Sequence, residues 1–153
     1  MNVNGKLNTI QIGKGKLKNT DLFLTMDDEK INVLSSFDND SIRGAVMLTC
    51  DVGKEVFFLS SKGKIEVNDL ADFGWGITGG KEAVKTGFDF VFAKKKGGDS
   101  FGNYAFRNFT YAGEKGDFIL DNVSIENRLN DGYYVTSLFS DIVDMQIEGH
   151  YMS

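Results

Sequence analysis

The 153-residue sequence contains no proline, although average usage would place about seven in a chain of this length. Proline removes a backbone donor from a sheet ladder and is excluded from central strands, so its absence is typical of a chain rich in β-sheet. No stretch approaches the roughly 20 apolar residues of a membrane-spanning helix. The first twenty residues also lack the apolar core of a signal peptide, so we expect either a cytoplasmic protein or a fragment of a longer one.

Cysteine and histidine are almost absent as well. Cys50 stands alone, which excludes an internal disulfide and any site with several thiolate ligands. His150 is the single imidazole, and nothing near it in the sequence would orient it for catalysis. The segment Gly74–Gly79 fits the dinucleotide pattern G-x-G-x-x-G but lacks the strand before it and the long helix after it. We therefore expect no enzymatic activity, no cofactor and no metal.

An excess of positive charge is also lacking. Seventeen basic against twenty-two acidic side chains give a net charge of −5, which argues against nucleic acid as a partner. The one lysine run, Lys94–Lys96, is more typical of a solvated hairpin tip than of an anion site. Thirteen phenylalanines and a hydrophobic fraction of 41% indicate a folded chain rather than a disordered one.

Apolar and polar residues alternate with a period of two along most of the chain. Ile31–Phe37 and Ile42–Cys50 each carry apolar residues on one face, and the turn tripeptide Asp38–Asp40 between them predicts a hairpin. Phe88–Phe92 places three phenylalanines on one face. Further strands are predicted at Leu22–Met26, Val56–Ser60, Ile65–Val67, Gly87–Ala93, Asn103–Tyr111, Phe118–Ile125, Tyr133–Phe139 and Met145–Met152.

Helix is predicted only in short pieces. Asn68–Phe73 begins with a capping residue and is expected to form a turn or two, and Lys81–Lys85 suits either a helical turn or a loop. Neither segment is long enough to cover a sheet of this size. The apolar face of the sheet must therefore fold onto itself, meet a partner or bind an apolar ligand.

Two stretches of the chain, about a hundred residues apart, also share similar short sequences, which we call the sequence echo. Short phrases near Asp21–Leu24, Val33–Phe37 and Ile42–Met47 return in the same order at residues 117–120, 135–139 and 147–152. The echo predicts two repeat units, at about 21–50 and 117–152, within a single β-rich segment that spans residues 1–153.

Three phrases in order resemble the TamB-type, AsmA-like (translocation and assembly module) envelope proteins of Gram-negative bacteria. The first phrase, Gly63–Gly74, is a strand followed by a turn that contains a leucine, a small residue, an aromatic residue and a glycine. The second is Phe118–Ile125, and the third is Tyr134–Asp141 with the closing strand Met145–Tyr151. The resemblance covers residues 65–151 and rests on strand patterns with a few polar anchors.

The resemblance implies an internal slice of a long protein that is anchored in the inner membrane and otherwise periplasmic. The fold it implies is all-β: an elongated, twisted antiparallel sheet curved into an open apolar groove, built from repeated hairpins with one or two short helical turns. The function it implies is lipid transfer between the inner and outer membranes. The implied partners are phospholipid acyl chains, neighbouring segments of the same parent protein and outer-membrane assembly proteins.

Residues on the more apolar face of each predicted strand are the expected lining of the groove. Two other functions stay open at this stage: a self-contained β-sandwich that acts as an adhesin or carbohydrate-binding module, and a closed calyx that holds one small apolar ligand. The candidate lining residues are Ile42, Val46, Leu48, Phe58, Phe88, Phe90, Phe92, Phe106, Ile147 and Tyr151.

Overall fold

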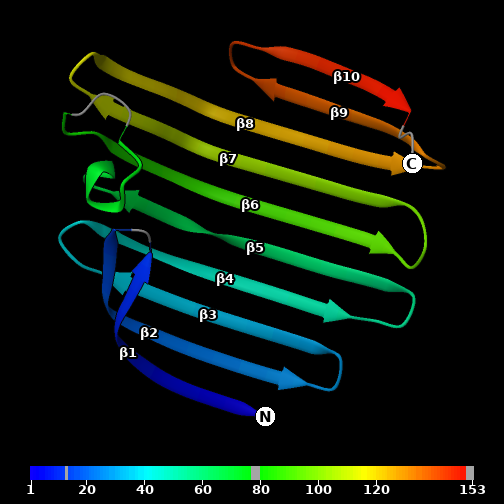
Figure 1. Ribbon diagram of the computed structural model, residues 1–153, viewed down its shortest axis with the longest axis horizontal. Coiled ribbons are helices and arrows are strands. Elements are labelled where there is room, and N and C mark those ends of the chain that lie inside the picture. Colours follow the sequence, from blue (N-terminus) through cyan, green and yellow to red (C-terminus); the bar gives the residue numbers. More distant parts are fainter. Residues whose placement is uncertain (13, 77–79, 151–153) are drawn as a thin grey trace.

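A computed structural model describes residues 1–12, 14–76 and 80–150. Ten antiparallel strands form one sheet in which the spatial order follows the order along the chain (Figure 1). One short 3-10 helix, η1, interrupts the succession of hairpins. The elements are β1 (Asn2–Ile12), β2 (Gly15–Asp27), β3 (Lys30–Asp38), β4 (Ile42–Val52), β5 (Val56–Val67), η1 (Leu70–Phe73), β6 (Ala83–Lys95), β7 (Ser100–Gly113), β8 (Gly116–Asn130), β9 (Tyr133–Ser140) and β10 (Asp144–His150).

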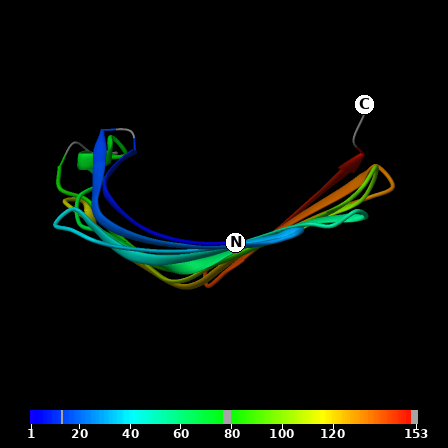
Figure 2. The same ribbon diagram turned by 90° about the horizontal axis from the view of Figure 1, so that it is seen from below.

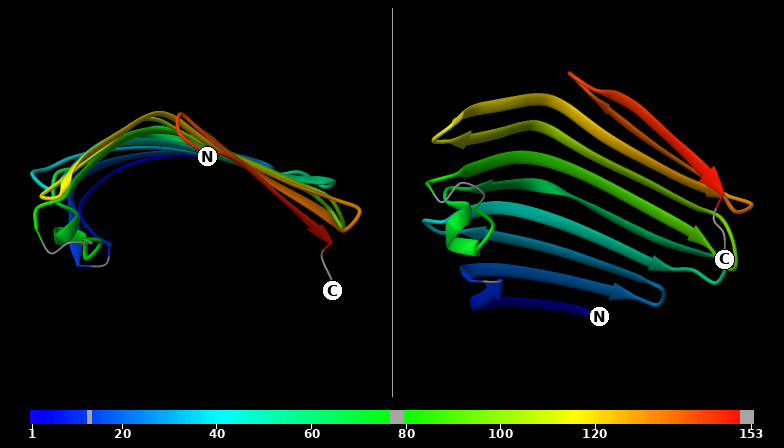
Figure 3. Two further views of the ribbon diagram at one scale, coloured as in Figure 1. Left: turned by 90° about the horizontal axis from the view of Figure 1, so that it is seen from above. Right: turned by 45° about the horizontal axis from the view of Figure 1, so that its top comes forward.

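The sheet is open and curved. Figures 2 and 3 show the strands bending together into an arc, with η1 on its inner side. In the described residues, β1 pairs only with β2 and β10 only with β9, so the sheet has two free edges. The predicted all-β, curved antiparallel sheet is confirmed, and the described residues form neither a two-sheet sandwich nor a closed calyx.

Alternation and register sort the side chains into an apolar face and a polar face. Phe90 pairs with Tyr104, and Tyr104 pairs with Ile125, so the three side chains leave the sheet on the same side. Ile42 and Val67 share that side and pack against Phe73 of η1. Because η1 lies within the arc, the apolar face is the inner one, which we call the concave face; its opposite is the convex face.

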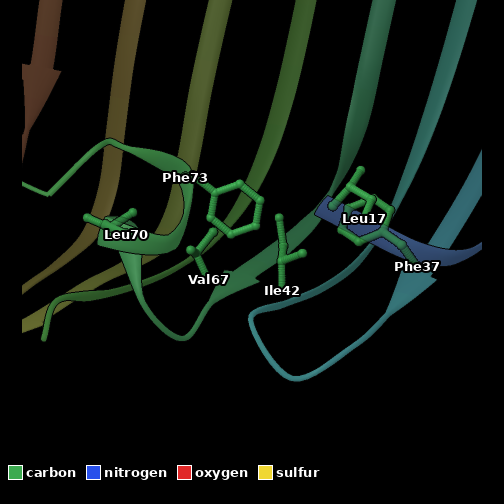
Figure 4. Packing of buried hydrophobic residues seen from close by; sticks show 6 residues of the cluster. All are labelled: Leu17, Phe37, Ile42, Val67, Leu70 and Phe73. Atoms are coloured by element: carbon green, nitrogen blue, oxygen red, sulfur yellow. The ribbon is translucent and has the colours of Figure 1, made fainter. Parts of the chain in front are cut away.

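A small closed core lies at one end of the concave face, under η1. The side chain of Phe73 is 2% exposed and lies among residues of β2, β3, β4 and β5 (Figure 4). Burying a phenylalanine side chain contributes about 2–3 kcal/mol, so this cluster fixes η1 to the sheet. The buried members are Leu17, Phe37, Ile42, Val67, Leu70 and Phe73.

Polar contacts complete the attachment of η1. Asp69 caps the helix by accepting the backbone N–H of Ala71, and Gly74 ends it in the left-handed region at φ 76°. Glu82 is fully buried, where its carboxylate accepts the hydroxyl of Tyr111 at 2.8 Å and its carbonyl accepts the N–H of Leu70 at 2.7 Å. The predicted turn at 68–73 is therefore present, and Ala83 already belongs to β6 rather than to a second helical turn.

Left-handed asparagines mark the irregular points of the strands. Asn19 has φ 52° and Asn108 has φ 51°, a conformation that asparagine tolerates better than most residues. One end of the β1–β2 pair curls toward the inner side of the arc (Figure 2). Leu17 of β2 belongs to the core beneath η1. Near Asn108 the register between β6 and β7 shifts.

The two segments of the sequence echo do not have the same orientation throughout. Val33 and Phe37 lie on the concave face, where Phe37 pairs with Gly44. Their counterparts, Val135 and Phe139, lie on the convex face, where Phe139 pairs with Asp144. Each segment supplies three successive strands, but the side chains of the middle phrase lie on opposite faces of the sheet in the two segments.

Nothing in the described ranges forms a helix long and apolar enough to cross a membrane.

Candidate functional site

The concave face carries very little charge. Outside the bulged positions, the register from β3 to β10 places a single charged side chain, Lys94, on this face of the described sheet. Lys94 stands at the end of β6, where the strand enters a hairpin turn. The charged residues of these strands otherwise alternate onto the convex face. The sheet is therefore strongly two-sided.

Aromatic rings gather at the middle of the concave face. The Phe90 ring lies 5.0 Å from that of Phe88, 5.3 Å from that of Phe106 and 5.7 Å from that of Tyr104, measured between centroids. The contacts to Phe106 and Tyr104 are edge-on, the arrangement that the ring quadrupoles favour. All four side chains are half-buried, and no second sheet or helix within the described residues covers them.

A hollow of about 260 Å³ adjoins this cluster. Gly102 forms part of its floor, since it pairs with both Phe92 and Asn127 and contributes no side chain. The walls are mostly concave-face side chains of β6, β7, β8 and β9. They include Phe92, Tyr104, Leu129, Tyr134 and Thr136.

The structure brings most of the predicted lining residues onto this one face. Eight of the ten share it by register, and Ile147 at the β10 edge is 49% exposed. Ile42 shares the face but is only 5% exposed, because η1 covers it; it belongs to the closed core and not to the open surface. The other seven on the face are Val46, Leu48, Phe88, Phe90, Phe92, Phe106 and Ile147.

The prediction that Phe58 lines the groove is wrong. Phe58 pairs with Asp51 and Ala93 on the convex face, whereas the adjacent Phe57 lies on the concave face with its ring 6.3 Å from that of Phe92. Two neighbouring phenylalanines satisfy the period-two pattern in either phase, so alternation alone could not choose between them. Tyr151, the tenth predicted residue, lies outside the described residues.

Sequence reasoning also omitted Tyr104 from the lining. Tyr104 contacts Phe90. It stands two residues before Phe106 on β7 and therefore on the same face, so the period-two pattern could have identified it. Trp75 is 49% exposed and its ring stacks on that of Phe73 at 5.2 Å, which places an aromatic surface at the end of the concave face near η1.

Groups suited to acid–base or metal chemistry do not converge on the concave face. Within the described ranges, no set of three His, Cys, Asp or Glu side chains could hold a metal ion. On the convex face, the Tyr133 hydroxyl donates to Glu148, which lowers the pKa of that carboxyl and raises the pKa of Tyr133. Both residues lie on the exposed final hairpin, away from the aromatic cluster.

Comparison with protein-family models, with curated proteins and with solved structures finds no significant match to this chain.

Proposed function

We propose that this chain is a non-catalytic groove segment that holds lipid acyl chains on its concave face during lipid transfer between the inner and outer membranes. One observation carries the proposal: a ten-stranded sheet presents a nearly uncharged apolar face, and among the described residues η1 alone covers it, at one end. An uncovered surface of this kind on a folded protein indicates an apolar partner.

Acyl chains match this surface physically. Each CH₂ group removed from water contributes about 0.8 kcal/mol, and this gain does not depend on direction or on a headgroup. A face without hydrogen-bonding partners at fixed positions therefore binds a chain in many registers. Such binding suits transfer, because a chain can slide along the surface without breaking a specific polar contact.

The resemblance to TamB-type, AsmA-like proteins supports the same function and supplies its setting. We place the segment in the periplasm, within a longer parent anchored in the inner membrane, with neighbouring segments and outer-membrane assembly proteins as further partners. The open edges β1 and β10 are compatible with such neighbours, since each leaves one side of a strand without a ladder partner among the described residues.

Charge substitutions on the two faces of β6 test the proposal. Phe90→Asp places a carboxylate within the aromatic cluster, where contact with acyl chains would cost several kcal/mol of desolvation. The matched control is Val91→Asp, which places the same carboxylate on the convex face of the same strand, opposite Ser60 and Asn103. Val46→Asp repeats the test on β4.

Binding of a fluorescent phospholipid is the measurement, with circular dichroism to check folding. We expect Phe90→Asp and Val46→Asp to lose most of the binding while staying folded, and Val91→Asp to bind like the unmodified chain. Equal binding by all three folded variants, or no binding by the unmodified chain, would contradict the proposal.

A further inference from the structure

A second hollow, of about 610 Å³, is lined by residues of β4, β5, β6 and β7, and its charged side chains lie on the convex face. Lys62, Lys64 and Glu66 follow one another at alternate positions of β5 and so leave the sheet on the same side. Register places Glu66 between Arg43 and Lys85 on that side. Gly87 separates Lys64 from Arg107.

The hollow has a charge opposite to that of the rest of the molecule. Five of the seventeen basic side chains line it, together with only two of the twenty-two acidic ones, Glu66 and Asp89. The remaining chain therefore has twelve basic and twenty acidic side chains. The basic residues of the hollow are Arg43, Lys62, Lys64, Lys85 and Arg107.

Three of these cations have no carboxylate within 4.0 Å among the described residues. Arg43 lies 4.0 Å from Asp38 and Lys85 lies 3.8 Å from Glu66, so both are partly neutralised. In the described part of the chain, no ion pair within 4.0 Å involves the other three basic residues of the hollow: Lys62, Lys64 and Arg107.

Gly87 keeps the space between these cations open. It stands between Lys64 on β5 and Arg107 on β7 in the same cross-strand row. A Cβ there would lie 3.6 Å from the carbonyl oxygen of Arg107, an ordinary contact, so the backbone does not require glycine at this position. The missing side chain leaves room for a ligand among the cationic groups.

We propose that this convex hollow binds a ligand that carries two or more clustered phosphate groups. Arg107 offers a planar fork of donors and the lysines offer compact ammonium groups, the two side chains that bind phosphate best. The cations come from neighbouring strands about 4.8 Å apart, so a single phosphate would not reach them all. The ligand is distinct from the acyl chains of the proposed groove, because these cations lie on the opposite face.

The test uses the full chain and two phosphate sources. Calorimetry with inorganic pyrophosphate measures binding of a soluble ligand, and sedimentation with vesicles of phosphatidylglycerol and phosphatidylcholine measures binding of a phosphate-bearing membrane surface. The test variant is Lys64→Gln with Arg107→Gln. The control is Lys54→Gln with Lys96→Gln, which removes the same charge from the turns at the other end of β5 and β6. Urea midpoints confirm that all variants are folded.

We expect the test variant to weaken binding by at least about tenfold, because it removes two charged hydrogen-bond donors from the hollow. The control should change affinity less than about threefold through long-range charge alone. Gly87→Leu, which fills the hollow at constant charge, should also weaken binding. Affinity for pyrophosphate would assign a soluble ligand, and affinity for the vesicles alone would assign a lipid headgroup. Equal losses in test and control, or no binding to either probe, would overturn the proposal.

Discussion

Phe88 lies directly across from Gly63 in the β5–β6 pair, and its ring covers the space where a side chain at Gly63 would stand. A Cβ at Gly63 would approach the ring to 3.0 Å and the carbonyl oxygen of Ala45 to 2.2 Å. Gly44 repeats the arrangement beneath Phe37 on β3. Glycine at these points lets adjacent strands crowd together on the concave face while aromatic rings replace the missing side chains.

Gly63→Ala should therefore destabilise the sheet, because the contact with the Ala45 carbonyl requires movement of the backbone. We expect a loss of about 1–3 kcal/mol, typical of overpacking. The control is Gly5→Ala on the edge strand β1, where a Cβ would meet nothing within 4 Å and stability should change by less than about 0.5 kcal/mol. Urea midpoints measure both. Equal effects of the two substitutions would contradict the close packing at Gly63.

Substitution by alanine should lower the stability of the protein more at Phe73 than at Phe90. Phe73 is buried in the closed core, so Phe73→Ala should cost about 3–5 kcal/mol through lost burial and a cavity. Phe90 is half-buried on the open face, where water can fill the gap, so Phe90→Ala should cost clearly less. Urea denaturation of the two variants is the comparison. A loss at Phe90 that equals the loss at Phe73 would indicate that the concave face is covered.

Asp141 ties the β9–β10 turn to an irregular point of β8. Its carboxylate oxygen accepts the backbone N–H groups of Asp121 at 2.5 Å and of Asn122 at 3.3 Å. Asp141→Ala should lower stability by about 1–2 kcal/mol, since both donors lose their partner. Asp141→Asn keeps an acceptor oxygen and should recover much of the loss. If the two variants have the same thermal midpoint, the contact contributes no stability.

The pKa of Glu148 should depend on Tyr133. The Tyr133 hydroxyl, with the Gln146 amide, stabilises the ionised carboxylate and lowers its pKa. A lowered pKa in the folded state means that the contribution to stability is present above the ordinary carboxyl pKa and is lost as pH falls through the lowered value. Tyr133→Phe should raise the pKa of Glu148 in an NMR titration. Tyr134→Phe, on the concave face, should leave it unchanged, and a shift of equal size in both variants would contradict the assignment.

Strand alternation was sufficient to predict the fold class and most of the apolar face, because the hydrophobic period is clear in β3, β4 and β6. It missed β1, where asparagine, threonine and glycine dilute the pattern over Asn2–Ile12. It also divided β5 into two strands, since Lys62 and Gly63 interrupt the apolar sequence although both stay in the ladder. The apolar pattern of a short segment gives no information on the cross-strand hydrogen bonds that continue a strand through such residues.

The convex hollow could not be predicted from the sequence. Its cations come from four strands, and between Arg43 and Arg107 lie more than sixty residues of chain. Only the register that places Gly87 between Lys64 and Arg107 brings them together. The phase of Phe57 and Phe58 was likewise settled by cross-strand pairing, which no single strand encodes.

Photo-crosslinking from positions 90 and 91 tests the central claim most directly. A photoreactive residue at either position, in cells that make this protein with labelled phospholipid, reports what contacts each face of β6. The groove predicts lipid adducts at position 90 and none at position 91, because neighbouring residues of one strand face opposite sides of the sheet. Equal labelling at both positions, or labelling at neither in a folded protein, would contradict the groove.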